Sequence, residues 1–333
     1  MSPVPSSRPP VTDLPESERV SPHLGEAAAF IDRWVRRTGL IQSFSAQRRF
    51  RRARCVDLAA RVAPQATCPR LQRTAAWIVW FHVLDDRCRH PRGEEYAFGF
   101  GVLPDFLPTD GGPTPPARTA LQRALADVWR MTAPAMSPAW RERFAGRFRE
   151  LSDRRPWDAL VAGSALDLVE YVCGCELPPS ARELASFRSV SGAATAVLAC
   201  DGAGPEAEAE TRAGAEARAG AEAFRDALRD ALRGALQRFV AEAARAGLPP
   251  AALSAVSAYA HALALWADGR LAWALHGGPA GAAAPEPGGH RPLLLAEDVT
   301  GVPVDLLRPR RPAPPPVPST SGSAGTALHR GRE

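Results

Sequence analysis

Apolar residues recur at intervals of three and four along most of this chain, from about His23 to about His276. This spacing puts them on one face of a helix, and no run of alternating apolar and polar residues indicates a strand. Prolines fall where the predicted helices should end, as at Pro64, Pro91 and Pro156. The pattern predicts helices over residues 25–37, 45–62, 69–90, 116–131, 137–151, 157–173, 180–200, 206–245 (whole or interrupted) and 249–275.

Composition changes at both ends of this helical region. Residues 1–22 are rich in proline and serine, and residues 279–333 are rich in glycine, proline and alanine. Such segments bury too little apolar surface to offset the entropy of ordering, so we expect both to be disordered. Segment 204–236 is rich in alanine, glutamate and arginine, which indicates a solvated helix. The expected architecture is all-α, a single-domain helical bundle over residues 23–278.

Arginine supplies all 41 basic residues, because the chain contains no lysine. The chain also contains no asparagine. A P-loop, a Schiff-base enzyme, a lysine general base and N-glycosylation are therefore excluded. The formal net charge is only +5, and the arginines are mostly scattered along the chain. Nucleic-acid-binding proteins concentrate basic residues on one face, so we expect no nucleic-acid partner.

The six cysteines show no paired spacing that would indicate a disulfide framework. The pair Cys173 and Cys175 is too closely spaced for a structural zinc site and has no second pair to complete one. Free thiols in a reducing compartment fit this usage. The first twenty residues lack a basic then apolar leader, and no apolar run approaches the ~18 residues of a membrane helix. We therefore expect a cytoplasmic protein without a membrane partner.

Two adjacent carboxylates, Asp85 and Asp86, stand near the C-terminal end of the predicted helix 69–90. A helix C-terminus favours cations, so this pair is either solvated or holds a cation. Mg²⁺ binds one or two carboxylates together with substrate phosphate oxygens, which is one interpretation. An ordinary solvated helix end is the other. A third is a transition-metal site, because His82, Asp86 and His90 are spaced to share a helical face.

Three separated segments carry further motifs. The first runs from Pro69 through Trp77 and Trp80 into the aspartate pair. The second, residues 179–192, has the sequence PSARELASFRSVSG, and the third, residues 265–273, has the sequence LWADGRLAW. In this order they resemble the aspartate-rich motif, the diphosphate-sensing arginine segment and the late tryptophan-rich helix of the bacterial class I terpene synthases. The resemblance extends over residues 25–276.

The resemblance implies a helical bundle around an apolar pocket that takes an acyclic prenyl diphosphate, with the head group at the mouth. Asp85 and Asp86 would bind Mg²⁺, with up to three ions implied by the family. Arg188 would contact the diphosphate, Ser191 would be a linker residue, and Gly192 would supply a carbonyl at a helix break. The implied reaction is release of diphosphate, followed by cyclisation or quenching of the carbocation. A homodimer is compatible with this resemblance.

Four aromatic residues are candidates for the pocket walls: Trp77, Phe81, Trp266 and Trp273. A carbocation must be kept from water and can be held over aromatic faces. Large aromatic residues at helical spacing also pack in ordinary cores, so both interpretations stay open.

The chain departs from the family pattern at several positions. Arg89 stands where another acid usually follows the aspartate pair. The family's second metal motif has no counterpart between Gly192 and Trp266, and this stretch is short. The arginine–tyrosine pair expected just after Trp273 is absent. Two hypotheses follow: a magnesium-dependent lyase, and a non-catalytic or degenerate relative that at most binds an isoprenoid.

Overall fold

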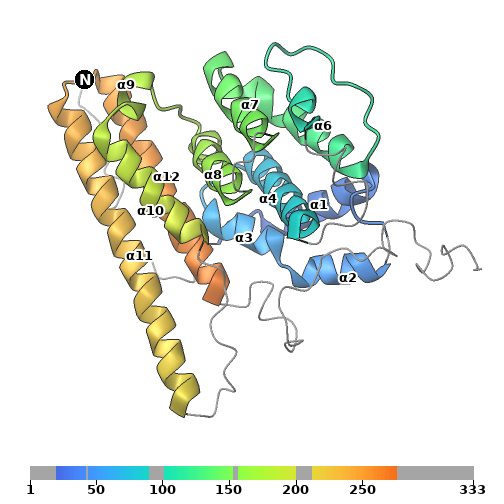
Figure 1. Ribbon diagram of the computed structural model, residues 1–333, viewed down its shortest axis with the longest axis horizontal. Coiled ribbons are helices and arrows are strands. Elements are labelled where there is room, and N and C mark those ends of the chain that lie inside the picture. The colour runs from blue at the N-terminus through green and yellow to red at the C-terminus, as the bar shows by residue number, and fades with distance from the viewer. Residues whose placement is uncertain (1–19, 43, 90–100, 153–156, 200–211, 276–333) are drawn as a thin grey trace, which may run out of the picture.

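The computed structural model describes residues 20–42, 44–89, 101–152, 157–199 and 212–275 (Figure 1). All regular elements in these ranges are helical, which confirms the all-α prediction. The terminal segments 1–22 and 279–333 lie almost wholly outside the described residues, and their predicted disorder stays a prediction. The elements are α1 (Leu24–Thr38), α2 (Phe44–Arg52), α3 (Cys55–Val62), α4 (Cys68–Arg89), η3 (Leu103–Phe106), α6 (Ala120–Thr132), η4 (Ala133–Ala135), α7 (Pro138–Ser152), α8 (Trp157–Cys173), α9 (Pro179–Arg182), α10 (Ala185–Ala199), α11 (Arg212–Arg245) and α12 (Pro250–Leu275).

One predicted helix is wrong, because residues 45–62 form two helices. Arg54 lies between α2 and α3 with φ 51° and ψ 34°, a left-handed conformation that ends α2. This conformation is unfavourable for a residue with a β-carbon, and neither glycine nor proline signals it here. A distant contact favours the turn: Trp273 Nε1 in α12 donates a hydrogen bond to the Arg54 carbonyl at 3.1 Å.

The prediction for residues 180–200 also needs correction at its start. The short helix α9 precedes α10, which begins at Ala185. Farther along, α11 runs without interruption from Arg212 to Arg245, and residues 206–211 lie outside the described part.

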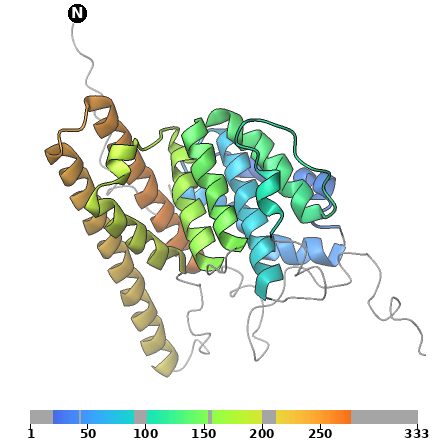
Figure 2. The ribbon, with the colours of Figure 1, turned by 45° about the horizontal axis from the view of Figure 1, so that its top comes forward.

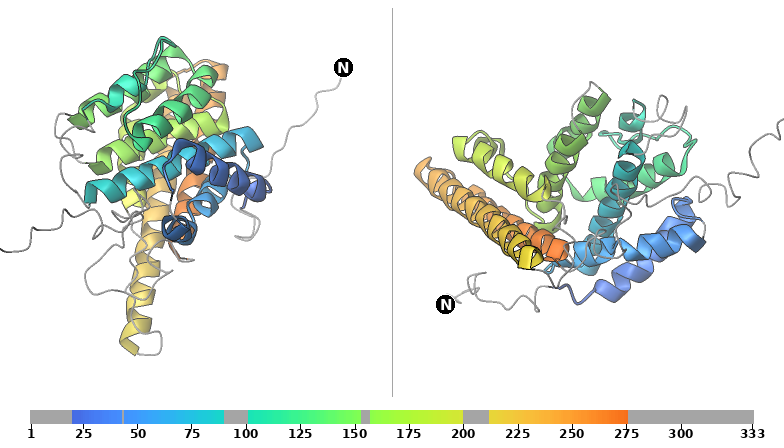
Figure 3. Two further views of the ribbon diagram at one scale, coloured as in Figure 1. Left: turned by 90° about the vertical axis from the view of Figure 1, so that its right-hand side faces the viewer. Right: turned by 60° about the horizontal axis from the view of Figure 1, so that its bottom comes forward.

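Five helices, α3, α4, α8, α10 and α12, pack against one another around the centre of the bundle. The helices α6 and α7 cover one side of this group, and α11 covers the other by packing on α10 and α12 (Figure 2). The long helix α11 extends well beyond its neighbours (Figure 3). Among the described helices, none combines the length and the apolar character that a bilayer-spanning segment needs.

An ion-pair network built on two buried carboxylates joins α7, α8 and α9. Asp167 and Glu170 of α8 are fully buried. Arg143 Nε lies 2.9 Å from Asp167 Oδ1, and Arg147 Nε lies 2.5 Å from Asp167 Oδ2. Arg182 contacts both carboxylates from α9, and Leu177 donates its backbone N–H to Glu170 Oε1 at 2.9 Å. The positive charges of three guanidinium groups therefore balance the negative charges of the two buried carboxylates.

Candidate functional site

A pocket of about 320 Å³ opens among the five central helices. Most of its wall is apolar, and four polar side chains also face it. The residues at the wall are Leu58 and Val62 of α3; Ile78, Phe81, His82 and Asp85 of α4; Val161, Ala162, Ala165 and Leu168 of α8; Thr195, Leu198 and Ala199 of α10; and Trp266, Arg270 and Trp273 of α12.

The residues of α4 that line the pocket lie on one face of the helix. Ile78, Phe81, His82 and Asp85 are separated by three, one and three positions, so they form one stripe along the helix. Asp85 is half-buried and is the carboxylate among the residues that line the pocket. Asp86 lies in the same turn of α4, and its side chain falls outside the described part. Of the predicted metal pair, Asp85 therefore lines the pocket.

Three of the four predicted aromatic wall residues line the pocket: Phe81, Trp266 and Trp273. They are 7%, 5% and 4% exposed, so each ring also packs against the protein. The stripe on α4 and the facing turns of α12 thus meet across one apolar space.

Trp77 is not among the residues that line this pocket, which corrects that expectation. Its side chain is fully buried in the contact of α4 with α6 and α7. The indole Nε1 donates to Thr132 Oγ1 at 3.0 Å, and the ring packs edge-on against Phe144 with centroids 4.9 Å apart. Trp77 is about 100° around the helix from Ile78 and lies beside Phe81, on the edge of the stripe that faces α6 and α7, so it belongs to the core.

The predicted diphosphate segment lies on α10 away from the pocket wall. Arg188 and Gly192 are exposed and Ser191 is half-buried, whereas Thr195, Leu198 and Ala199 face the pocket. The expected helix break at Gly192 is wrong, because α10 continues through it to Ala199. Glycine inside a helix costs only about 1 kcal/mol relative to alanine, and the flanking residues sustain the helix.

The sequence assigned the diphosphate contact to Arg188 and gave Arg270 no role, yet Arg270 is the arginine that lines the pocket. Its guanidinium carbon lies 5.1 Å from the ring centroid of Trp273, and Nη2 donates to the Leu198 carbonyl at 3.5 Å. The spacing was the available signal, because Arg270 lies four residues after Trp266 and three before Trp273, on the same face of the predicted helix. His82, three residues before Asp85, also lines the pocket. His90, which would share a transition-metal site with it, lies outside the described residues.

Residues 76–162, which include Asp85 and most of the pocket stripe, match the family model described as terpene synthase family 2, C-terminal metal binding. Pentalenene synthase of Streptomyces avermitilis is 32% identical over 187 residues, which cover 50% of this chain and 56% of that protein. Over this part of its length, the chain is similar to bacterial terpene synthases. Pentalenene synthase of Streptomyces arenae is 34% identical over 140 residues, 42% of each chain. This terpene synthase relative thus spans about half the length of the curated relatives it matches.

Solved structures share the fold of this terpene synthase relative. Germacradien-4-ol synthase from Streptomyces citricolor aligns with a TM-score of 0.60 at 23% identity, covering 78% of this chain and 95% of that one. The α-eudesmol synthase structure aligns with a TM-score of 0.64 at 22% identity, covering 81% and 100%. The helical bundle is therefore the class I terpene synthase fold.

A metal-binding family of this kind implies a divalent metal ion, typically Mg²⁺. The donor chemistry at the pocket is compatible with that ion, because the Asp85 carboxylate supplies the hard oxygen ligand that Mg²⁺ prefers.

Proposed function

We propose that this terpene synthase relative ionises an acyclic prenyl diphosphate and then cyclises or quenches the carbocation, releasing diphosphate. One observation carries the proposal: the Asp85 carboxylate shares an apolar pocket with the aromatic side chains of Phe81, Trp266 and Trp273. A prenyl diphosphate has the same division, with a charged head group and a long apolar chain. The pocket volume of about 320 Å³ falls at the lower end of the range for small-molecule sites.

The pocket walls would act by excluding water and by offering aromatic faces. An apolar enclosure keeps water from a carbocation, which would otherwise be captured. The faces of Phe81, Trp266 and Trp273 would attract positive charge through their ring quadrupoles, an effect worth about 2 kcal/mol or more in a dry site. Helices α8 and α10 complete the enclosure with small and branched side chains.

Asp85 and Asp86 would hold Mg²⁺, with up to three ions implied by the resemblance. When bound, the metal would neutralise charge on the diphosphate oxygens. We extend the proposal to Arg270, which would contact the diphosphate from the pocket wall, because a fixed guanidinium suits bidentate binding of phosphate. The roles of Arg188 and Ser191 stay predictions, and Arg188→Ala in the same assay tests the first of them.

The decisive experiment incubates the purified protein with geranyl, farnesyl and geranylgeranyl diphosphate, with Mg²⁺ or with a chelator. Hydrocarbon or alcohol products and released diphosphate are both measured. Asp85→Asn removes the carboxylate charge at nearly constant shape and should abolish turnover, whereas Asp105→Asn, at an exposed position outside the pocket, should leave it unchanged. Full activity of Asp85→Asn would refute the role given to this carboxylate.

The competing hypothesis is a non-catalytic or degenerate relative, and the same experiment separates the two. Absence of turnover with all three substrates, in folded protein that still binds a prenyl diphosphate, would support the non-catalytic relative. Product formation that requires Mg²⁺ would exclude it.

A further inference from the structure

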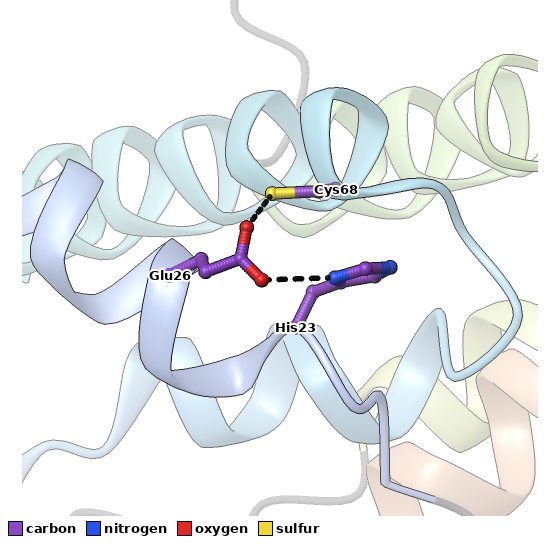
Figure 4. Close-up of side chains that lie close together, drawn as sticks. All are labelled: His23, Glu26 and Cys68. Atoms are coloured by element: carbon purple, nitrogen blue, oxygen red, sulfur yellow. Dashed lines mark hydrogen bonds and ion pairs between the residues drawn. The ribbon is translucent and has the colours of Figure 1, made fainter.

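Three side chains capable of binding a metal converge at the start of two helices, in a cluster separate from the pocket (Figure 4). His23 immediately precedes α1, Glu26 lies in the first turn of α1, and Cys68 is the first residue of α4. His23 Nδ1 lies 3.3 Å from Glu26 Oε1, and Cys68 Sγ lies 3.0 Å from Glu26 Oε2. One ligand atom from each residue lies within 4.8 Å of the other two. Glu26 therefore links the other two side chains through its two carboxylate oxygens.

The backbone around this cluster is fixed by regular structure. The Ser21 N–H donates to the Ala60 carbonyl at 3.0 Å, which anchors the turn before α1 on α3. The His23 N–H donates to Ser21 Oγ at 3.3 Å. On the other side, Gln72 Nε2 donates to Cys68 Sγ at 3.3 Å, one helical turn along α4. Because α1 and α4 pack against each other, the approach of the three ligands is a consequence of the fold.

We propose that His23, Glu26 and Cys68 form a binding site for a transition-metal ion of the Zn²⁺ type. Imidazole nitrogen, thiolate sulfur and carboxylate oxygen are all ligands of Zn²⁺, at about 2.0–2.1, 2.3 and 2.0–2.2 Å respectively. Those bond lengths in a tetrahedron place neighbouring ligand atoms about 3.3–3.6 Å apart. The separation of 3.3 Å between His23 Nδ1 and Glu26 Oε1 matches this range, and Cys68 Sγ lies 3.0 Å from the other carboxylate oxygen, Oε2. Because one ligand atom from each residue lies within 4.8 Å of the other two, side-chain rotation would bring all three to a common ion.

The ligand set defines both the charge and the selectivity of the site. Thiolate and carboxylate together carry two negative charges, which balance a divalent ion. Glu26 is exposed and the other two ligands are half-buried, so water has access to the fourth position. Mg²⁺ prefers an octahedral set of oxygen ligands and competes poorly for sulfur and imidazole. The site therefore differs in metal preference from the carboxylate in the pocket.

Binding exchanges one proton for the metal ion. The Cys68 S–H, which donates to Glu26 in the metal-free cluster, must release its proton to the solvent before sulfur can coordinate. No redox change occurs, and affinity rises with pH until the thiol is fully ionised. The metal would join the beginning of α1 to the beginning of α4 and so stabilise the folded state.

Cobalt substitution tests the proposal directly, because thiolate–Co²⁺ coordination produces a charge-transfer absorption band. The full-length protein is titrated with Co²⁺ and the band is then displaced with Zn²⁺. We expect saturation at one ion per chain with at least micromolar affinity. Cys68→Ser should abolish the band, and His23→Ala should weaken binding by at least about tenfold.

Cys173→Ser is the matched control, because it removes a thiol elsewhere in the fold and should leave the band unchanged. Asp85→Asn should also leave it unchanged, which separates this site from the one in the proposed function. A band that survives Cys68→Ser, or that disappears in Cys173→Ser, would overturn the proposal, as would the absence of saturable binding. In the unmodified chain, Zn²⁺ should slow alkylation of Cys68 at least about tenfold, which needs no variant. An unchanged alkylation rate would likewise refute the site.

Discussion

Gly269 of α12 lies directly against the backbone of α3, where a β-carbon would stand only 2.3 Å from the carbonyl oxygen of Arg61. It would also stand 2.7 Å from the backbone nitrogen of Val62. One turn later, Trp273 Nε1 donates to the Arg54 carbonyl before α3 begins. These contacts fix the position of the helix that contributes Trp266 and Trp273 to the pocket.

Replacement of this glycine should be strongly unfavourable. Gly269→Ala would place a methyl group inside the backbone of α3, so the two helices must move apart. Overpacking of this kind costs about 1–3 kcal/mol, measured as a lower free energy of unfolding in urea. Gly220→Ala in α11 is the matched control, because no described atom beyond its own helix lies within 4 Å of its β-carbon. That control should gain about 0.5–1 kcal/mol from helix propensity. Equal effects of the two substitutions would contradict the close approach.

The buried carboxylate of Asp167 should contribute more to stability than any exposed acid. It contacts the guanidinium groups of Arg143, Arg147 and Arg182 with no solvent access of its own. Asp167→Asn would leave Arg143 and Arg182 paired with Glu170 and would remove the carboxylate that Arg147 contacts. Breaking such a buried pair costs about 3–5 kcal/mol. Urea unfolding of the variant and of the unmodified protein measures the difference.

Asp32→Asn provides the control for this network. Asp32 Oδ2 lies 3.3 Å from Arg51 Nη2, and these side chains are 31% and 62% exposed. Exposed pairs of this kind contribute less than about 1 kcal/mol and are screened by salt. A large loss in Asp32→Asn, or a negligible loss in Asp167→Asn, would show that burial does not govern these ion pairs.

Helical periodicity predicted most of the fold because it is a local property. The spacing of Ile78, Phe81 and Asp85 defines one stripe in any α-helix, whatever surrounds it. The all-α bundle therefore followed from periodicity, whereas Asp85 was singled out by its pairing with Asp86 and by the family resemblance. The break at Arg54 did not follow from periodicity, because its cause is a hydrogen bond from Trp273, 219 residues away in the chain.

The side of a helix that meets a pocket depends on partner helices that periodicity does not identify. Trp77 and Phe81 are one turn apart and stack with ring centroids 5.7 Å apart, yet Phe81 lines the pocket and Trp77 lies in the core. On α10, motif resemblance indicated Arg188 and Gly192, whereas the pocket meets the helix farther along, at Thr195 and Leu198. The sequence motifs identified candidate residues for the site, and the packing of the helices decided which of those residues line the pocket.

Two cysteines should differ sharply in the pH dependence of their reactivity. Burial raises the pKa of the Cys55 thiol to about 12, and a hydrogen bond with Cys175, 2.8 Å away between sulfurs, lowers the pKa of Cys173. The thiolate is the reactive form, so Cys173 gains reactivity at lower pH than a free thiol, while Cys55 stays protonated. Iodoacetamide labelling between about pH 6 and pH 9, followed by peptide mass spectrometry, measures both rates.

Denaturation supplies the control for the thiol experiment. In urea both cysteines should approach the ordinary thiol pKa of about 8.5, and their labelling rates should converge. Comparable labelling of Cys55 and Cys173 in the folded protein at pH 7 would contradict the burial of Cys55.

Phe81 and Phe144 pack on the same tryptophan and should nevertheless respond differently to substitution. Both rings contact Trp77, but Phe81 faces the pocket and Phe144 is fully buried in the core. Phe81→Leu keeps an apolar wall and removes an aromatic face, so under the proposed function it should shift the ratio of terpene products. Phe144→Leu should leave that ratio unchanged and lower the free energy of unfolding by about 1 kcal/mol. Gas chromatography of the products and urea unfolding measure the two effects. A product ratio that changes equally in both variants would mean that Phe81 acts on the reaction only through the packing of Trp77.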